Sequence, residues 1–177
     1  MAKGEVSVLR AMAKADANFK RDPEMYEFYV VAKLDGWKKR RTCVGNSQCP
    51  ILPQAAAGAP LTRFWAQGPR VKGNKYVPAG TVIASGWDEY GLYRSLPHGN
   101  HAAIYLSQTA KSMSVLDQWG GKERWVEQHG FERPLPFGKG GSDGGDDFYV
   151  VLSCKFTEIE FMMMKMQEAY AAAAAFG

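Results

Sequence analysis

The chain has 177 residues, of which 46% are hydrophobic. This is enough for one well-filled core, so we predict a single domain over residues 1–177. The 22 Lys and Arg against 18 Asp and Glu give a net charge of +4, a mild excess that suits nucleic acid, lipid headgroups or bacterial cell wall without selecting among them. No apolar run approaches the roughly 20 residues that cross a bilayer, which argues against membrane insertion.

The first 42 residues are predicted to be a helical N-terminal part. Within 5–20, apolar residues recur at helical spacing, at Val6, Leu9, Met12, Ala13 and Ala17. Asp22-Pro23 then has the pattern of an N-cap followed by a first helical residue. The stretch "PEMYEFYVVAKL" is therefore predicted as a second helix ending at the turn signal Asp35-Gly36, with a strand as the alternative because of its aromatic and β-branched residues.

Two further features of this N-terminal part bear on location and partners. The run "WKKRR", Trp37 to Arg41, is a dense basic cluster. We interpret it as a solvated turn and expect no nucleic-acid partner, since no nucleic-acid motif accompanies it. The first 20 residues are interrupted by charge and lack the apolar segment of a signal peptide, so synthesis in the cytoplasm without a signal peptide is expected.

From Gly45 the chain changes to short elements separated by Gly and Pro, which predicts a sheet following the helices and hence an α+β fold. Residues 54–57 favour a short helix that stops at Gly58, and "LTRFWAQGPRV" is predicted as a connector whose two aromatic residues pack on the core. Strands are predicted in "VPAGTVIASG", "NHAAIYLS" and "MSVLDQWG", the last two joined by the polar turn "QTAKS". These elements fall within a central part, residues 43–137.

The remainder of the chain is predicted to be a loop, a strand and a helix. "FGKGGSDGGDD" contains glycines without the strand-then-helix setting of a phosphate-binding loop, so residues 138–147 are interpreted as a flexible acidic surface loop. In residues 148–177, "FYVVLSCKFTEIEF" predicts a long strand and "MMMKMQEAYAAAAAFG" a terminal helix, with its methionines used for packing.

The three cysteines, Cys43, Cys49 and Cys154, do not have metal-ligand spacing. An odd number leaves at least one thiol free, and an oxidising compartment would favour one disulfide plus one reactive thiol. Cys49 follows a turn sequence and precedes Pro50, a residue favoured at the first position of a helix. A helix N-terminus favours thiolate over thiol, so Cys49 is the candidate nucleophile. Pro53 makes the first turn of this helix irregular, because it cannot donate a backbone hydrogen bond.

A thiolate needs a base, and the histidines available are His98, His101 and His129. His101 begins a predicted strand, on the same face as two small or aromatic residues of that strand. Asp117 lies on the next strand, and a tight antiparallel turn would bring it beside His101, where a carboxylate orients the imidazole. A single His or Asp near a strand is usually structural, but the order of Cys, His and Asp in this context indicates nucleophilic catalysis.

Five blocks, "GNSQCPILPQAAAGAP", "FWAQGPRV", "VPAGTVIAS", "GNHAAIYLS" and "VLDQWGG", resemble in that order the signature blocks of the second family of type VI secretion amidase effectors. These are antibacterial toxins related to CHAP and NlpC-like papain-fold cysteine peptidases. The resemblance spans Gly45 to Gly121. It implies a papain-like α+β fold with N-terminal helices packed on a small antiparallel sheet, and a catalytic core within residues 43–137. This sequence departs from the family pattern at Pro50 and Pro53.

The resemblance implies that Cys49 is the nucleophile, His101 the general base and Asp117 the orienting acid. The Cys49 backbone N–H and Gln48 would hold the oxyanion, although Gln48 fits an exposed polar role equally well. The implied reaction is amide hydrolysis in peptidoglycan stem peptides, at the D-Ala to meso-diaminopimelate cross-link, with no metal or cofactor. The implied partners are a cognate immunity protein and the type VI secretion machinery, which delivers the toxin to the periplasm of a target bacterium. A disulfide between Cys43 and Cys154 is expected there.

Two other classes of function stay open at this point. A Cys-His-Asp site also serves protein deamidases and transglutaminase-like enzymes, and the sequence does not separate acyl transfer to water from acyl transfer to an amine. A non-enzymatic basic module that binds the envelope or nucleic acid is the other class, and only the net charge and "WKKRR" favour it.

Overall fold

The computed structural model describes residues 3–94, 96, 98–121 and 123–155. Its strands form one antiparallel seven-stranded sheet with the order β1-β7-β3-β4-β5-β6, and β2 also pairs with β7. The elements are α1 Lys3–Lys14, the 3-10 turn η1 Pro23–Met25, β1 Tyr26–Phe28, α2 Leu34–Lys38, α3 Ile51–Ala57, the 3-10 turn η2 Thr62–Phe64, β2 Ala66–Arg70, β3 Val82–Ser85, β4 His101–Gln108, β5 Ser112–Leu116, α4 Glu123–His129, β6 Glu132–Pro136 and β7 Tyr149–Cys154.

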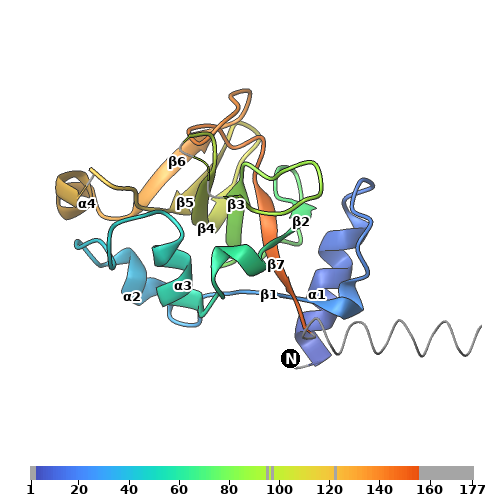
Figure 1. Ribbon diagram of the computed structural model, residues 1–177. Coiled ribbons are helices and arrows are strands. Elements are labelled where there is room, and N and C mark those ends of the chain that lie inside the picture. Colours follow the sequence, from blue (N-terminus) through green and yellow to red (C-terminus); the bar gives the residue numbers. More distant parts are fainter. Residues whose placement is uncertain (1–2, 95, 97, 122, 156–177) are drawn as a thin grey trace, which may run out of the picture.

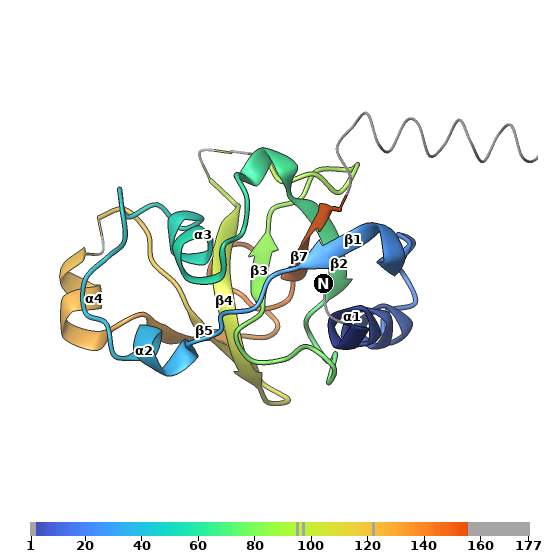
Figure 2. The same ribbon diagram turned by 90° about the horizontal axis from the view of Figure 1, so that it is seen from below.

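The sheet is covered on both faces. Figures 1 and 2 show α1 beside β1 and β2, while α2, α3 and α4 lie on the side of β4, β5 and β6. Alternate residues such as Ile83, Ala103 and Val115 join the α1 core cluster. Their neighbours join two clusters on the other side, one of which includes Leu52 of α3. Residues 101–106 of β4 are consequently all buried, as expected for a strand at the centre of a doubly covered sheet.

The predictions for the central part are largely confirmed. The strands predicted in "VPAGTVIASG", "NHAAIYLS" and "MSVLDQWG" are β3, β4 and β5, and β4 and β5 pair antiparallel with Ile104 opposite Leu116. The short helix is α3, which ends at Gly58 in the left-handed conformation, with φ 69°. That conformation is nearly free of steric cost only for glycine, so the helix stops there.

In the N-terminal part, the predicted second helix is wrong. The Asp22 side chain caps as expected, accepting a hydrogen bond from the Glu24 N–H, but it starts only the 3-10 turn η1. The aromatic residues that follow form β1, because they gain a partner in β7, with Phe28 opposite Leu152. The strand alternative therefore holds for this segment.

The first helix is shorter than predicted, and the expected turn at Asp35-Gly36 is helical. Helix α1 ends at Lys14 rather than near residue 20. The Asp16 carboxylate accepts hydrogen bonds from the backbone N–H groups of Asn18 and Arg70, and this local bonding competes with helix continuation. Asp35 and Gly36 lie inside α2, whose apolar side chains pack on the cluster around Leu52.

The predicted connector contains a strand, and only one of its aromatic residues is in the core. Trp65 is buried, whereas Phe64 is 55% exposed. Strand β2 follows and passes so close to β7 that a Cβ at Gly68 would lie 2.5 Å from the Val150 carbonyl oxygen. Two elements without a sequence prediction, α4 and β6, complete this half of the structure. Strand β6 contains two prolines, which an edge strand tolerates.

The last predicted elements are only partly within the described residues. Residues 137–147 form a loop without regular elements. The predicted long strand is confirmed as β7 up to Cys154, and the predicted terminal helix over 162–177 lies outside the described residues. No helix in the described part of the chain combines the length and apolar character needed to cross a membrane.

Candidate active site

Cys49 lies in a turn immediately before α3, as the sequence predicts. Pro50 has helical backbone angles and caps the helix, and the Gln54 N–H donates to its carbonyl at 3.1 Å. Pro53 is buried in the first turn and has no N–H to offer the Cys49 carbonyl. The first turn of α3 therefore lacks the bond to the Cys49 carbonyl, and the bond from Gln54 to Pro50 is the first one made. Cys49 lies at the N-terminal end of this irregular turn.

The loop of residues 44–48, here called the cysteine loop, is fixed by a residue that sequence reasoning missed. Gln118 is fully buried. Its side-chain carbonyl accepts from the Val44 N–H at 2.8 Å, and its amide donates to the carbonyls of Val44 and Gln48, both at 3.0 Å. Gln118 therefore joins the cysteine loop to the end of β5. Its position next to Asp117 in the "DQW" block is the sequence signal that could have found it.

His101 and Asp117 are paired, as predicted from the two neighbouring strands. His101 is the first residue of β4 and is 4% exposed, and Asp117 directly follows β5 and is 0% exposed. His101 Nε2 and Asp117 Oδ2 are 2.7 Å apart. The rings of Trp119 and Phe148 contact the imidazole edge to face, at 6.2 and 6.3 Å between centroids. With Nε2 bound to Asp117, Nδ1 is the nitrogen left to exchange a proton with a thiol.

The environment of His101 favours its charged form. Burial acts to lower the pKa of His101, but hydrogen bonds and charges of Asp117 and Cys49 outweigh burial and raise this pKa to about 9. The structure thus brings Cys49, His101 and Asp117 into one interacting group. At neutral pH an imidazolium is favoured, which is the proton-donating form that a thiolate partner requires.

Arg133 on β6 is a second residue that the sequence analysis missed. Its Nε donates to Asp117 Oδ2 at 2.7 Å, the same oxygen that bonds His101, and its guanidinium lies 4.7 Å from the centre of the Trp119 ring. Asp117 Oδ1 is buried without a hydrogen-bond partner among the described residues. Arg133 therefore supplies the positive charge that balances a fully buried carboxylate. No strand was predicted here, so no sequence signal placed Arg133 beside Asp117.

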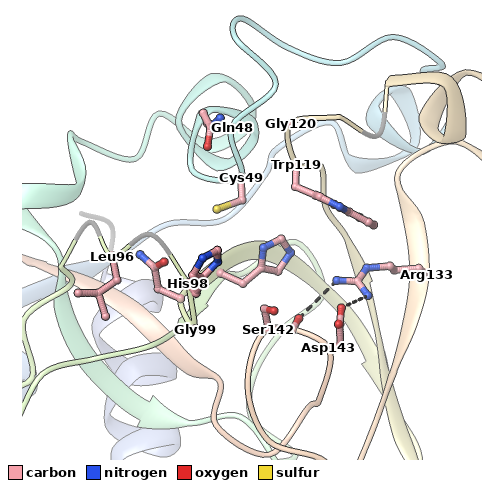
Figure 3. A pocket seen from close by; sticks show the side chains of 12 residues that line it. Gln48, Cys49, Leu96, His98, Gly99, Trp119, Gly120, Arg133, Ser142 and Asp143 are labelled. Carbon is pink, nitrogen blue, oxygen red and sulfur yellow. Dashed lines mark hydrogen bonds and ion pairs between the residues drawn. The ribbon is translucent and has the colours of Figure 1, made fainter.

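Arg133 also connects Asp117 and His101 to the loop of residues 137–147. Its terminal nitrogens donate to Asp143 Oδ1 at 3.3 Å and to the Ser142 carbonyl at 3.4 Å, shown as dashed lines in Figure 3. Both contacts are long, and the Asp143 side chain is 62% exposed. The loop interpreted as a surface feature therefore forms one wall of the site.

These residues surround a pocket of about 470 Å³. Figure 3 shows the Cys49 sulfur beside the cavity, with Arg133 and Asp143 on one side and Leu96 and His98 on the other. The lining residues are Gln48, Cys49, Leu96, His98, Gly99, Asn100, His101, Trp119, Gly120, Arg133, Ser142 and Asp143. Predicted residues Gln48, Cys49 and His101 thus reach the cavity, and Asp117 stands behind His101.

The other candidate residues lie apart from this chemistry. His129 is on α4, with its ring 5.2 Å from that of Trp125. All three cysteines are free, so the expected bridge between Cys43 and Cys154 is wrong for this structure. Cys43 packs on the cluster beneath α3, where burial raises the pKa of its thiol, whereas Cys154 is exposed on β7 near β1, beyond β3 and β4.

Comparisons with known proteins place this chain in a family and bear on its fold. A family model described as domesticated amidase effector 2 matches residues 24–151. A curated relative from Salmonella typhi, described as a type VI secretion amidase effector 2 protein, is 35% identical over 91 residues, which make up 51% of this chain and 67% of the relative. A solved structure described as type 6 secretion amidase effector 2 has a TM-score of 0.61 and 27% identity, over 73% of this chain and 97% of the solved chain. The resemblance and the papain-like α+β fold expected from the sequence are both confirmed.

Proposed function

The chain belongs to the domesticated amidase effector 2 family, the second family of type VI secretion amidase effectors, and we propose that it hydrolyses peptidoglycan amide bonds with Cys49 as the nucleophile. The observation that carries this mechanism is the position of His101. Its imidazole interacts with Cys49 on one side and bonds the buried Asp117 on the other. Such a chain of thiol, imidazole and carboxylate suits acyl transfer.

In the proposed reaction the proton of Cys49 has passed to His101, which gives the imidazolium that the raised pKa of His101 favours, and the Cys49 thiolate attacks the amide carbonyl. The Cys49 backbone N–H and the Gln48 side-chain amide would bind the oxyanion. His101 would then protonate the leaving amine as the C–N bond breaks, giving a thioester. Water, deprotonated by His101, would attack the thioester, and the C–S bond would break to release the peptide acid and restore the Cys49 thiolate beside the His101 imidazolium. Asp117 would keep Nδ1 of His101 directed at these proton transfers.

The proposed substrate is the D-Ala to meso-diaminopimelate cross-link between peptidoglycan stems, which the family resemblance suggests. The pocket of about 470 Å³ is open at the surface and lined mainly by polar side chains, which suits a short peptide better than a folded protein segment. The proposal also includes delivery by the type VI machinery into the periplasm of a target cell. It further includes a cognate immunity protein that plugs the cleft between Cys49 and His101.

Digestion of purified cross-linked muropeptides, followed by mass spectrometry, tests the reaction. The unmodified protein should convert cross-linked dimers to monomers, while Cys49→Ala and His101→Ala should release none with an unchanged circular dichroism spectrum. Cys43→Ala is the matched control and should remain fully active, because Cys43 does not line the pocket. Turnover at the rate of the unmodified protein by Cys49→Ala would refute the proposed nucleophile.

Expression in two compartments of a Gram-negative host separates peptidoglycan from a protein substrate. Cytoplasmic expression should be tolerated because that compartment holds no mature cross-linked wall. Expression behind a periplasmic signal peptide should lyse the host, and Cys49→Ala should remove the effect. Equal killing from both compartments would contradict the peptidoglycan substrate and favour the deamidase or transglutaminase reading of the same three residues.

A further inference from the structure

Tyr93 is an aromatic residue behind the pocket that the proposed reaction has not used. It is 6% exposed and belongs to the core cluster against which Cys49 packs. Its ring contacts those of Trp65 and Trp87, with centroids 5.1 and 5.5 Å away. The backbone of Tyr93 is bridged to that of Trp87 and its N–H donates to the Trp65 carbonyl. Its ring is therefore held in place from two sides.

The hydroxyl of Tyr93 is buried, and no group in the described part of the chain meets it in good hydrogen-bond geometry; only Cys49 and Asn100 interact with it, more loosely. A buried hydroxyl without a good hydrogen-bond partner lowers the free energy of unfolding, so the presence of the Tyr93 hydroxyl calls for an explanation. Cys49 packs against the cluster that contains Tyr93, and burial, followed by the charge of Cys49, raises the pKa of Tyr93. Asn100 is the other polar side chain acting on the hydroxyl, and its amide already donates to the Arg94 carbonyl at 2.7 Å.

A protonated hydroxyl beside a sulfur gains a strong acceptor only when the sulfur is ionised. A thiol is a weak acceptor, whereas a thiolate accepts a charge-assisted hydrogen bond. The raised pKa of Tyr93 means that the phenol keeps its proton through the pH range in which Cys49 reacts. The Tyr93 hydroxyl is thus matched to the ionised form of Cys49, which is the form that reacts.

We propose that Tyr93 is a further catalytic residue, whose hydroxyl donates a hydrogen bond to the Cys49 thiolate and holds it ready for attack. The thiol proton passes to His101, and Tyr93 keeps its own proton throughout. His101 and Tyr93 are the titratable groups that face the sulfur, from β4 and from the aromatic cluster, with Asp117 and Arg133 behind His101. This inference rests on Cys49 as the nucleophile and adds a donor fixed in advance by aromatic packing.

Alkylation of Cys49 by iodoacetamide tests the proposal without any peptidoglycan substrate. The rate is followed as a function of pH by mass spectrometry of the Cys49 peptide, which excludes the signals of Cys43 and Cys154. In Tyr93→Phe the rate near pH 6 should fall about ten- to a hundredfold, the factor expected for one hydrogen bond to a charged group. The half-maximal rate should move about one to two pH units higher.

The stability of the same variant separates a catalytic from a structural role. Because the hydroxyl has no partner among the described residues, Tyr93→Phe should keep or raise the thermal unfolding midpoint. Tyr105→Phe is the matched control, since Tyr105 is equally buried but belongs to the cluster on the other face of the sheet. It should alkylate like the unmodified protein. An unchanged rate in Tyr93→Phe, or a rate lost together with the fold-stabilising contacts, would overturn the proposal.

A second variant keeps the test decisive if Tyr93→Phe does not fold. Site-specific 3-fluorotyrosine at position 93 keeps the ring and makes the hydroxyl a stronger donor, so Cys49 alkylation should extend to lower pH. An unchanged pH profile would contradict the inference. Because alkylation needs no substrate, a protein that fails to cleave muropeptides but shows these shifts would refute the proposed substrate and leave the role of Tyr93 intact.

Discussion

Asp117→Asn is the substitution that most directly tests the electrostatics of the site. Burial acts to lower the pKa of His101, but Asp117 and Cys49 together raise it to about 9 from an ordinary value of 6.5. This difference corresponds to on the order of 3 kcal/mol in favour of imidazolium. Asparagine keeps the shape of the side chain but removes its charge. Burial is then opposed by Cys49 without the help of Asp117, so the pKa of His101 should fall by about two units.

Two measurements follow this change. The imidazole resonances of His101, titrated by NMR, report its pKa directly. In the unmodified protein, amide hydrolysis should decline as pH rises past about 9, where the imidazolium loses its proton, and in Asp117→Asn the decline should begin about two pH units lower. Asp143→Asn is the control, because Asp143 contacts Arg133 but not His101. A His101 pKa that stays near 9 in Asp117→Asn would refute the reasoning.

The sign of the linked stability change is fixed by the same shift. A raised pKa in the folded protein contributes stability that is complete below the unfolded value of 6.5 and is lost as pH rises through about 9. The difference in unfolding free energy between the unmodified protein and Asp117→Asn should therefore be largest in mild acid and shrink towards pH 9. Urea unfolding at several pH values measures it, and a difference that grows with pH would contradict the assignment.

Three other substitutions have defined outcomes. Gln118→Ala should lower the urea unfolding free energy by about 1–3 kcal/mol, because it leaves partly buried backbone groups of the cysteine loop unpaired, and it should reduce muropeptide hydrolysis. Arg133→Gln should slow hydrolysis about tenfold without lowering the pKa of His101, as read by NMR; this factor is an order-of-magnitude expectation for a lost supporting contact. Gly86→Ala should lower the thermal midpoint, with a cost of about 1–3 kcal/mol, because Gly86 has φ 80° and a Cβ there would lie 2.4 Å from Asn100 Cβ.

The sequence predicted the site best where local periodicity alone decides the outcome. Alternation along two strands joined by a short turn is sufficient to place His101 near Asp117, and the proline and glycine signals are sufficient to delimit α3. The same rules failed for β1, because its helix start signal is real but its aromatic residues gain more from pairing with β7. Tertiary partners override local propensity in such segments.

The missed residues share one property, which is that their roles depend on segments far away in the chain. Arg133 meets Asp117 only because β6 pairs with β5, and the prolines of β6 hide its strand character. Gln118 acts through a loop 70 or more residues before it. Tyr93 is brought near Cys49 only by the packing of the cluster around Trp65. Arg133 and Asp117 are 16 residues apart, and Gln118 and Gln48 are 70 apart, so helical or strand periodicity along a single element does not connect them.

The nucleophile and its base come from different layers of the molecule. Cys49 precedes a helix packed on the sheet, His101 and Asp117 belong to the sheet, and Gln118 joins the two layers through the cysteine loop. The short α3 and its loop form a smaller cooperative unit than the seven-stranded sheet. Partial opening of α3 and the cysteine loop would separate the sulfur from the imidazole while the strands stay paired. Heating should then inactivate the protein reversibly before it unfolds, and amide protons of the cysteine loop should exchange with solvent ahead of those in β4.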